Sequence, residues 1–300
     1  WSLFTTVAPG LLGSAEHFRA RFAGPIERNA DETARKALAE VIRPFILRRL
    51  KSEVASDLPP RTDVRIDIEL SEPERRLYDR LRLSTIEALN LPGPEDRADK
   101  SRMRVLAAML RLRQLACHPR LVDPESEVAS SKHHVLMDLV ERAVEGGHQI
   151  LVFSQFTSHL DLVATELERA GIRFHRLQGN TPTRARRTRV DAFQRGEFDV
   201  FLLSLKAAGT GLNLTAAEYV VHLDPWWNPA IEDQATDRAH RIGQDKPVTV
   251  YRLVSTDTIE ETIMELHGEK RALMNDLLAG TGKATTLSPE QLMDLISRGV

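Results

Sequence analysis

Two apolar runs decide the fold of this chain: DVFLLS at residues 199–204 and YVVHLD at residues 219–224. Each run is short and nearly continuous in apolar residues, as expected for a strand buried on both faces of a sheet. Similar runs stand at three further places: 149–154, 172–177 and 248–254. Amphipathic helical patterns alternate with the runs, near 133–146, 156–170, 182–195 and 229–242. The sequence therefore predicts an α/β fold in which a parallel sheet carries helices on both faces.

The segments outside this alternating region are mainly helical in pattern. Helical patterns precede it at 15–22, 31–50, 72–91 and 101–117, and follow it at 258–278 and 288–297. Pro92-Gly93-Pro94 interrupts the helical pattern between 91 and 101, because proline and glycine break helices. Residues 62–70 instead alternate between apolar and charged side chains, which predicts a half-buried strand. We therefore expect helical insertions before the sheet and C-terminal helices after it.

Composition places the chain among ordinary globular proteins, with 42% hydrophobic and 28% charged residues in 300. No apolar run approaches the about 18 residues that a membrane span requires, so we expect an intracellular protein without a membrane partner. The single cysteine, Cys117, excludes an internal disulfide framework and a cysteine-built zinc site. We expect it to be a buried thiol and assign no metal site. The chain begins with Trp1, and we expect it to be a piece of a longer protein.

Charge is unevenly distributed, although the formal net charge is only −2. From Arg169 to Arg195 there are eight arginines and one acid, Asp191. Such a stripe is either a solvated surface or a phosphate-binding footprint. The helix expected after Thr181-Pro182 carries part of this charge, and we favour phosphate contacts for Arg184 and Arg187.

Polar signatures follow the predicted strands at their carboxyl ends. These signatures are Ser154-Gln155, Gln178–Thr181, Ser204–Asn213 and Asp224–Trp227. Because the carboxyl ends of parallel strands share one edge of the sheet, where ligands bind in open α/β folds, we expect a single functional edge.

The sequence of residues 228–244 predicts a polar helix directly after the last of these signatures. Asn228-Pro229 is typical of a helix start, and Gly243 of a helix stop. Gln234, Arg238 and Arg241 are spaced to lie on one face of such a helix. Two guanidinium forks side by side suit the oxygens of a triphosphate. A solvated face, paired with neighbouring acids, is the alternative interpretation.

The run from Lys206 to Gln244, with SLKAAGTGLNL and VVHLDPWWNP, closely resembles motifs five and six of the second motor lobe of SWI/SNF-type ATP-dependent DNA translocases, within helicase superfamily two. The resemblance implies a RecA-like sheet. It also implies four parts: the tail of a first motor lobe with a helical insertion (1–60), a linker strand and second insertion (61–131), the RecA-like second lobe (132–253) and C-terminal brace helices (254–300).

The resemblance further implies residue roles. Arg238 and Arg241 would act as arginine fingers on Mg-ATP held by the first motor lobe of the same protein. The nucleotide cleft would include Gln234, Gly211 and Asn213. Contacts to the backbone of double-stranded DNA, without sequence preference, would come from Ser154, Gln155, Thr181, Arg184, Arg187, Lys206, Gly209 and Thr210. Trp226 and Trp227 would couple the lobes, with core packing and base stacking as alternatives.

No P-loop and no D-E-x-[HD] box occur in the chain. Gly280–Thr285 lacks the Walker A spacing, and we interpret it as a linker. We therefore expect the chain alone to be inactive as an ATPase and its parent to be an ATP-dependent hydrolase. We expect the parent to be cytoplasmic, and associated with the nucleoid if prokaryotic, and the resemblance allows a DNA-bound protein as its target. Two alternatives stay open: a stand-alone DNA-binding module and a strand-separating helicase.

Overall fold

Contacts divide the described residues into two units: those up to residue 55 together with 266 and 267, and those from 57 to 265. The computed structural model describes residues 1–29, 31–46, 55, 57–90, 98–179, 181–208 and 211–267. The helix predicted at 288–297 and the linker predicted at 280–285 lie outside the described residues.

The first unit is helical. Its elements are α1 (Ser2–Val7), α2 (Ala15–Phe18), the π-helical turn η1 (Arg19–Ala23), α3 (Gly24–Asn29), α4 (Glu32–Ile42) and the 3-10 turn η2 (Arg43–Phe45). Asp31 caps α4 by accepting hydrogen bonds from the amides of Thr33 (2.8 Å) and Ala34 (3.0 Å). The helix expected over 31–50 gives way at η2, where Pro44 has no amide to donate.

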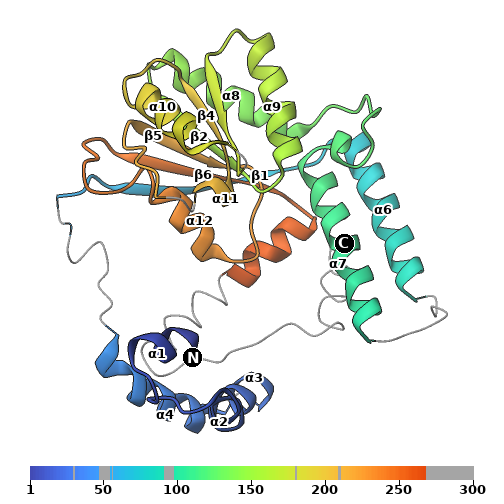
Figure 1. Ribbon diagram of the computed structural model, residues 1–300. Helices are drawn as coiled ribbons and strands as arrows, with labels where there is room; N and C mark the ends of the chain where they lie inside the picture. The colour runs from blue at the N-terminus through green and yellow to red at the C-terminus, as the bar shows by residue number, and fades with distance from the viewer. Residues whose placement is uncertain are drawn as a thin grey trace. The chain divides into compact units, whose positions relative to one another are not determined.

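A six-stranded sheet forms the centre of the second unit (Figure 1). Its strands are β1 (Arg61–Ile68), β2 (Gln149–Ser154), β3 (Phe174–Leu177), β4 (Val200–Ser204), β5 (Ala217–His222) and β6 (Val248–Ser255). They stand in the order β1-β6-β5-β2-β4-β3, and every pair is parallel. The predicted parallel sheet is confirmed, with strand boundaries within a few residues of those expected.

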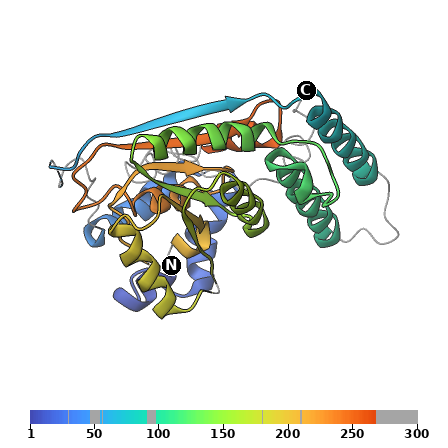
Figure 2. The same cartoon turned by 90° about the horizontal axis from the view of Figure 1, so that it is seen from above.

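The alternating strand predicted at 62–70 is part of this sheet. It forms β1, which pairs in parallel with β6 from Arg61↔Val248 to Ile68↔Ser255. From Asp63 to Ile68 its exposed and covered residues alternate, as its sequence pattern predicts. Figure 2 shows β1 as the long edge strand. The predicted linker strand is therefore an edge strand of the sheet.

Helices cover both faces of the sheet, as expected. The helices around the sheet are α8 (Ser131–Glu145), α9 (Thr157–Arg169), α10 (Thr183–Gln194), α11 (Leu205–Ala208) and α12 (Pro229–Thr236). On one face α8 and α9 pack over Ile150 and Val152, and on the other α10 and α12 pack over Leu151 and Phe153. Successive residues of a strand point to opposite faces, so the continuous apolar run of β2 supplies both cores.

Two long helices, α6 (Glu72–Asn90) and α7 (Ala98–Cys117), lie side by side and project from the sheet (Figures 1 and 2). The C-terminal half of α7 is buried through Met109, Leu112 and Ala116. The short turn η3 (Pro119–Leu121) then leads towards α8. Among the described helices, none combines the length and the apolar composition needed to cross a bilayer.

A buried ion pair joins three parts of this unit. Lys132 at the start of α8 is fully buried, and its Nζ donates to Glu260 Oε2 and to the carbonyl of Leu223 (3.1 Å). Glu260 belongs to the helical residues 259–267 and also accepts from the amide of Ser255 (2.9 Å). Cys117 at the end of α7 donates to its other oxygen. The carboxylate thus has a partner from α7, α8 and the end of β6.

We expect Lys132→Met to destabilise the protein by about 3–5 kcal/mol, because it leaves the Glu260 carboxylate buried without a cation. Urea unfolding should show this loss, and the double variant Lys132→Met, Glu260→Gln should recover much of it. Lys246 is exposed and paired with Glu218, so Lys246→Met should cost at most about 1 kcal/mol. Equal costs for the two single variants would contradict this assignment.

Candidate functional site

Loops from separate strands meet at the carboxyl edge of the sheet. Four of the predicted site residues, Gln155, Lys206, Trp226 and Gln234, line one pocket of about 460 Å³. They follow β2, β4 and β5 or lie on α12, so parallel strand direction alone brings them together. The other lining residues are Leu110, Phe156, Leu205 and Ile231. The expectation of a shared edge is met for these four residues.

Asp224 is the buried anchor of this edge. Its carboxylate accepts from Ser154 Oγ and from the amide of Gln155 (3.2 Å). Burial raises the pKa of Asp224, while the hydrogen bond from Ser154 and the charge of Arg113 oppose that rise. The carboxylate therefore fixes the turn that places Gln155 at the pocket.

The prediction that Ser154 contacts DNA needs correction. Its side chain is 0% exposed and its hydroxyl is bonded to Asp224. A hydroxyl enclosed in this way holds the β2 turn and cannot reach a phosphate without breaking a buried hydrogen bond.

Arg113 of α7 contacts the loop after β5. It was not among the site residues predicted from the sequence. Its Nη2 donates to the carbonyl of Pro225 (2.7 Å), and its guanidinium carbon lies 5.5 Å and 5.3 Å from the ring centres of Trp226 and Trp227. Burial lowers the pKa of Arg113, and nearby acids, with Asp224 first, oppose this. Both tryptophans are half-buried.

Glu232 of α12 holds the same loop from the other side. It is 0% exposed, accepts from the amide of Trp226 (2.7 Å) and pairs with Arg252 of β6 (3.1 Å). Arg252 also pairs with Asp63 of β1. The sequence did carry a signal for Arg113 and Glu232. Each is a charged residue that stands three or four positions from apolar residues on the buried face of its helix.

The arginine pair does not lie on a helix, contrary to expectation. Asn228 caps α12 as predicted, accepting from the amide of Ala230 (3.1 Å), but α12 ends at Thr236. The amides of Arg238 and Ala239 donate three residues back, to the carbonyls of Ala235 (3.1 Å) and Thr236 (3.0 Å), so the helix gives way to tighter turns. The carbonyl of Arg238 accepts from the amide of Leu214 (2.9 Å), and that of Ala239 accepts from Gln244 Nε2 (3.2 Å). These carbonyls would otherwise accept from amides one helical turn later.

This arginine turn, residues 237–243, contacts the loop that follows the Gly-Thr-Gly run. Besides the Arg238–Leu214 bond, Arg241 Nη1 donates to the carbonyl of Leu212 (3.2 Å). Gly211 has φ +65°, a conformation that glycine adopts without strain. Gly211 and Asn213 are exposed, whereas Gly209 and Thr210 lie outside the described residues. Arg238 Nε is buried and has no hydrogen-bond partner among the described residues.

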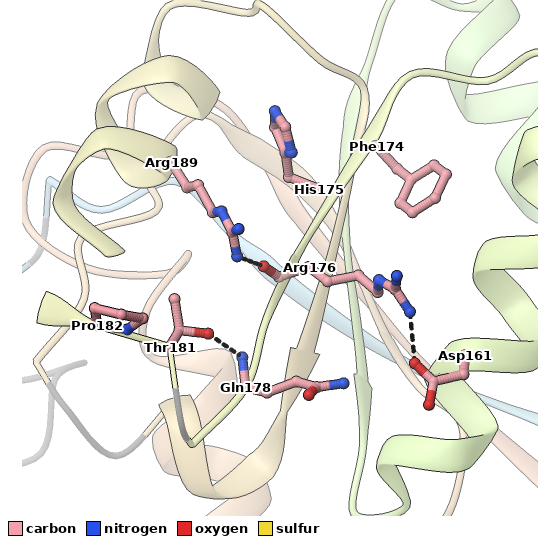
Figure 3. A pocket seen from close by; sticks show the side chains of 8 residues that line it. All are labelled: Asp161, Phe174, His175, Arg176, Gln178, Thr181, Pro182 and Arg189. Carbon is pink, nitrogen blue, oxygen red and sulfur yellow. Dashed lines mark hydrogen bonds and ion pairs between the residues drawn. The ribbon is translucent and has the colours of Figure 1, made fainter. Parts of the chain in front are cut away.

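A second hollow, of about 660 Å³, lies beside the loop that follows β3 (Figure 3). Thr181 lines it, and its hydroxyl accepts from the amide of Gln178 (3.0 Å). Arg186 binds the carbonyls of Thr181, Gln178 and Gly179, so it braces this loop. Arg184 and Arg187 are exposed, have no ion-pair partner among the described residues, and line neither pocket.

Two groups of side chains have the composition of metal ligands: His118, His133 and Glu166, and Cys117, His159 and Asp224. Their lone pairs are already engaged in part. His118 Nδ1 accepts from the amide of Arg120 (3.0 Å), and Asp224 accepts from Ser154. Burial raises the pKa of the Cys117 thiol, which opposes the thiolate that a metal requires. The group with Cys117 and Asp224 is therefore a poor metal site in this arrangement.

The three histidines instead pack as a buried column. His133 lies between His118, at a ring distance of 4.6 Å, and His159, at 5.0 Å. Burial and the neighbouring His133 lower the pKa of His118 to about 4. The same two causes lower the pKa of His159 well below its ordinary value. These two imidazoles are therefore neutral at pH 7.

Two family models match the chain. The Helicase conserved C-terminal domain matches residues 131–243, and the SNF2-related domain matches residues 1–121. Among curated relatives, YwqA of Bacillus subtilis, whose name describes an ATP-dependent helicase/translocase, is 37% identical over 99% of this chain and 33% of its own length. The mouse SWI/SNF-related matrix-associated actin-dependent regulator of chromatin subfamily A member 1 is 34% identical over 100% of this chain and 30% of its own length. The chain thus spans about a third of these relatives.

Solved structures of SWI2/SNF2 ATPases are also similar to this chain. The Sulfolobus solfataricus SWI2/SNF2 ATPase core in complex with dsDNA is 32% identical, with a TM-score of 0.65 over 100% of this chain and 64% of that chain. The C-terminal domain of that ATPase is 26% identical, with a TM-score of 0.62 over 80% of this chain and 100% of that chain.

We expect the histidine column to make the protein less stable in mild acid. Because the folded pKa values of His118 and His159 lie below the unfolded value of about 6.5, the unfolded chain binds more protons as pH falls from there. Stability should then drop by up to about 1.4 kcal/mol per pH unit for each group, and the contribution of His118 should level off near pH 4. Unfolding measured from pH 7.5 to 4.5 tests this.

His159→Phe keeps an aromatic ring beside His133 and removes one titration, so its stability should fall less steeply with acid. His134 neighbours the column in sequence but is exposed, and His134→Gln should leave the slope unchanged. If the stability of His159→Phe falls with acid as steeply as that of the unaltered protein, the assigned role of His159 in the pH dependence is contradicted.

Proposed function

The chain belongs to the SWI/SNF family of ATP-dependent helicases, and from this premise we propose that it supplies the second motor lobe of an ATP-dependent translocase on double-stranded DNA. The observation that carries the proposal is the contact between its two predicted functional segments. The loop after Gly211 is hydrogen-bonded to the arginine turn at both Arg238 and Arg241. A change at DNA can therefore reach the arginines through two hydrogen bonds.

Arg238 and Arg241 act on ATP in this proposal. Their charges are permanent and their forks match phosphate oxygens. Arg238 Nε has no hydrogen-bond partner among the described residues, which is consistent with an arginine whose bonding changes when a nucleotide binds. Gln234, exposed on α12, and the exposed Gly211 and Asn213 border the same turn.

Mg-ATP would be the substrate, and its metal would neutralise part of the phosphate charge. The residues that grip the nucleotide and the metal come from the first motor lobe of the same protein, because this chain has no P-loop. The arginines of this chain then stabilise the negative charge that develops on the transferred group. The chain alone is inactive as an ATPase.

DNA contacts come from exposed cations in segments that follow β3 and β4. Arg184 and Arg187 on α10 and Lys206 after β4 are exposed. Thr181, Gln155 and the amides near Gly209 and Thr210 add polar contacts. Charges that meet phosphates position a duplex without reading its sequence, which matches a motor that moves along DNA. The two tryptophans after β5 couple the lobes.

The alternatives differ in what they leave unexplained. A stand-alone DNA-binding module gives no role to the arginine turn bonded to the 211–214 loop. A strand-separating helicase shares the ATP chemistry, and a strand-displacement assay on the full-length protein distinguishes it from a duplex translocase. The translocase would work where cellular DNA lies, in the cytoplasmic nucleoid of a prokaryote, and could act on DNA-bound proteins.

In the full-length protein, Arg241→Ala should lower kcat for DNA-stimulated ATP hydrolysis by about 10³-fold or more, because a finger stabilises charge mainly in the transition state. Arg238→Ala should behave alike. Arg241→Lys should recover only part of the rate, since an ammonium lacks the fork. At saturating DNA, Arg184→Ala is the control and should keep its kcat. Normal kcat in both alanine variants would show that the turn is only a solvated surface.

Binding of the full-length protein to unrelated duplexes should be equal and salt-sensitive. In the triple variant Arg184→Ala, Arg187→Ala, Lys206→Ala, the slope of log K against log salt should flatten by about 0.9 for every phosphate that the protein no longer neutralises. Arg195, at the other end of α10, is paired with Glu197, so Arg195→Ala should leave the slope unchanged. An unaltered slope in the triple variant would place the DNA path elsewhere.

A further inference from the structure

Arg113 is a cation enclosed by the loop that leads into α12. Its side chain is 3% exposed, although it carries a permanent charge. The guanidinium lies over three aromatic rings, at 5.7 Å from the ring centre of Phe156 and at similar distances from Trp226 and Trp227. Its Nη2 hydrogen bond to the Pro225 carbonyl fixes its direction. A cation held over ring faces in a dry site is bound more strongly than one at the surface.

The same loop is held on its far side by α12. Glu232 accepts from the amide of Trp226, one residue beyond the carbonyl that Arg113 binds. A shift of the loop relative to either helix would leave a buried polar group without its partner, which is costly. The loop, the base of α7 and the start of α12 therefore move together or not at all.

Among the described residues, the hydrogen bonds that join α7 to the strand and helix ends of the sheet come from its C-terminal end. There the carbonyl of Ala116 accepts from Ser255 Oγ (2.8 Å) and that of Cys117 accepts from Ser130 Oγ (3.1 Å). Its earlier turns project beside α6 (Figures 1 and 2) and expose Met103 and Leu106. A helix of 20 residues is about 30 Å long, so a small tilt at the projecting end reorients the base that carries Arg113.

We propose that Arg113 is a positioning residue that couples the helix pair α6–α7 to the arginine turn. Tilting of the pair is transmitted through Arg113 to the Pro225–Trp227 loop, through Glu232 to α12, and from the end of α12 to Arg238 and Arg241. The inference rests on the function proposed above for those two arginines. It adds a mechanical input to them from helices that lie outside the sheet.

The test uses the full-length protein and Arg113→Met, which keeps the length of the side chain and removes its charge. We expect kcat for DNA-stimulated ATP hydrolysis to fall about 10- to 100-fold while KM for ATP stays within about twofold, as for misplacement of groups that act in the transition state. Rates are divided by the fraction of molecules that bind DNA in a stoichiometric titration, so that a misfolded fraction cannot imitate the effect. Arg111→Met, at an exposed position of the same helix, is the matched control and should keep the wild-type kcat.

A double-mutant cycle tests the route itself. Trp227→Leu should lower kcat, and adding Arg113→Met should lower it little further, because residues in one contact do not act independently. Arg113→Lys keeps a cation over the rings and should recover part of the rate. If Arg113→Met does not fold, Arg113→Lys and Trp227→Leu complete the same cycle.

Wild-type kcat in folded Arg113→Met, an equal loss in Arg111→Met, or losses that multiply in the double variant would each overturn the inference. Arg238→Ala and Arg241→Ala in the same assay keep the two proposals apart. Wild-type kcat in both Arg238→Ala and Arg241→Ala overturns the proposed function, whereas a large loss in these variants with no loss in Arg113→Met overturns only the coupling.

Discussion

Parallel pairing of every strand in the sheet is the constraint on which the rest of the structure depends. A chain that builds such a sheet must return after each strand through a crossover, and its helices end up on both faces. The carboxyl ends of β2, β4 and β5 then open on the same edge. The loops after them need no sequence relation to one another to form one pocket, because the sheet sets their positions. The residues of this edge are free to carry chemistry, since the apolar strands behind them supply the packing.

Charges buried behind this edge give it rigidity. Asp224, Glu232 and Glu260 are all nearly or fully buried, and each accepts two or more hydrogen bonds. A buried carboxylate is unfavourable unless several donors surround it. The geometry that satisfies all three therefore allows little variation in where α7, α8 and α12 sit against the sheet. The fixed geometry of this edge therefore depends on the hydrogen-bond donors to these carboxylates and not on the loops themselves.

The local sequence was informative wherever one element accounts for its own pattern. The apolar runs at 149–154 and 199–204 identified buried strands, because both faces of a parallel sheet exclude water. Asn228-Pro229 identified the start of α12, since cap and first turn lie within a few residues of each other. The helix end could not be read in the same way. Gly243 is typical of a helix stop, but the helix gives way to tighter turns after Thr236, and the segment that follows bonds to Leu214, which is distant in the chain. The prediction that Ser154 contacts DNA was wrong for a related reason. Its hydroxyl bonds to Asp224, which is distant in sequence.

By itself the sequence determined the fold class, the family and the edge on which the candidate site lies, because periodicity, strand direction and contiguous motifs are local properties of a chain. Only the tertiary structure decided which side chains face that edge and which support it from within. It placed Arg113 among the rings of Trp226 and Trp227 and moved Arg238 and Arg241 from a helix face to a turn. It also made the strand at 61–68 an edge of the sheet. Each of these outcomes depends on a contact between residues far apart in the chain, and such contacts leave no spacing that a single sequence can display.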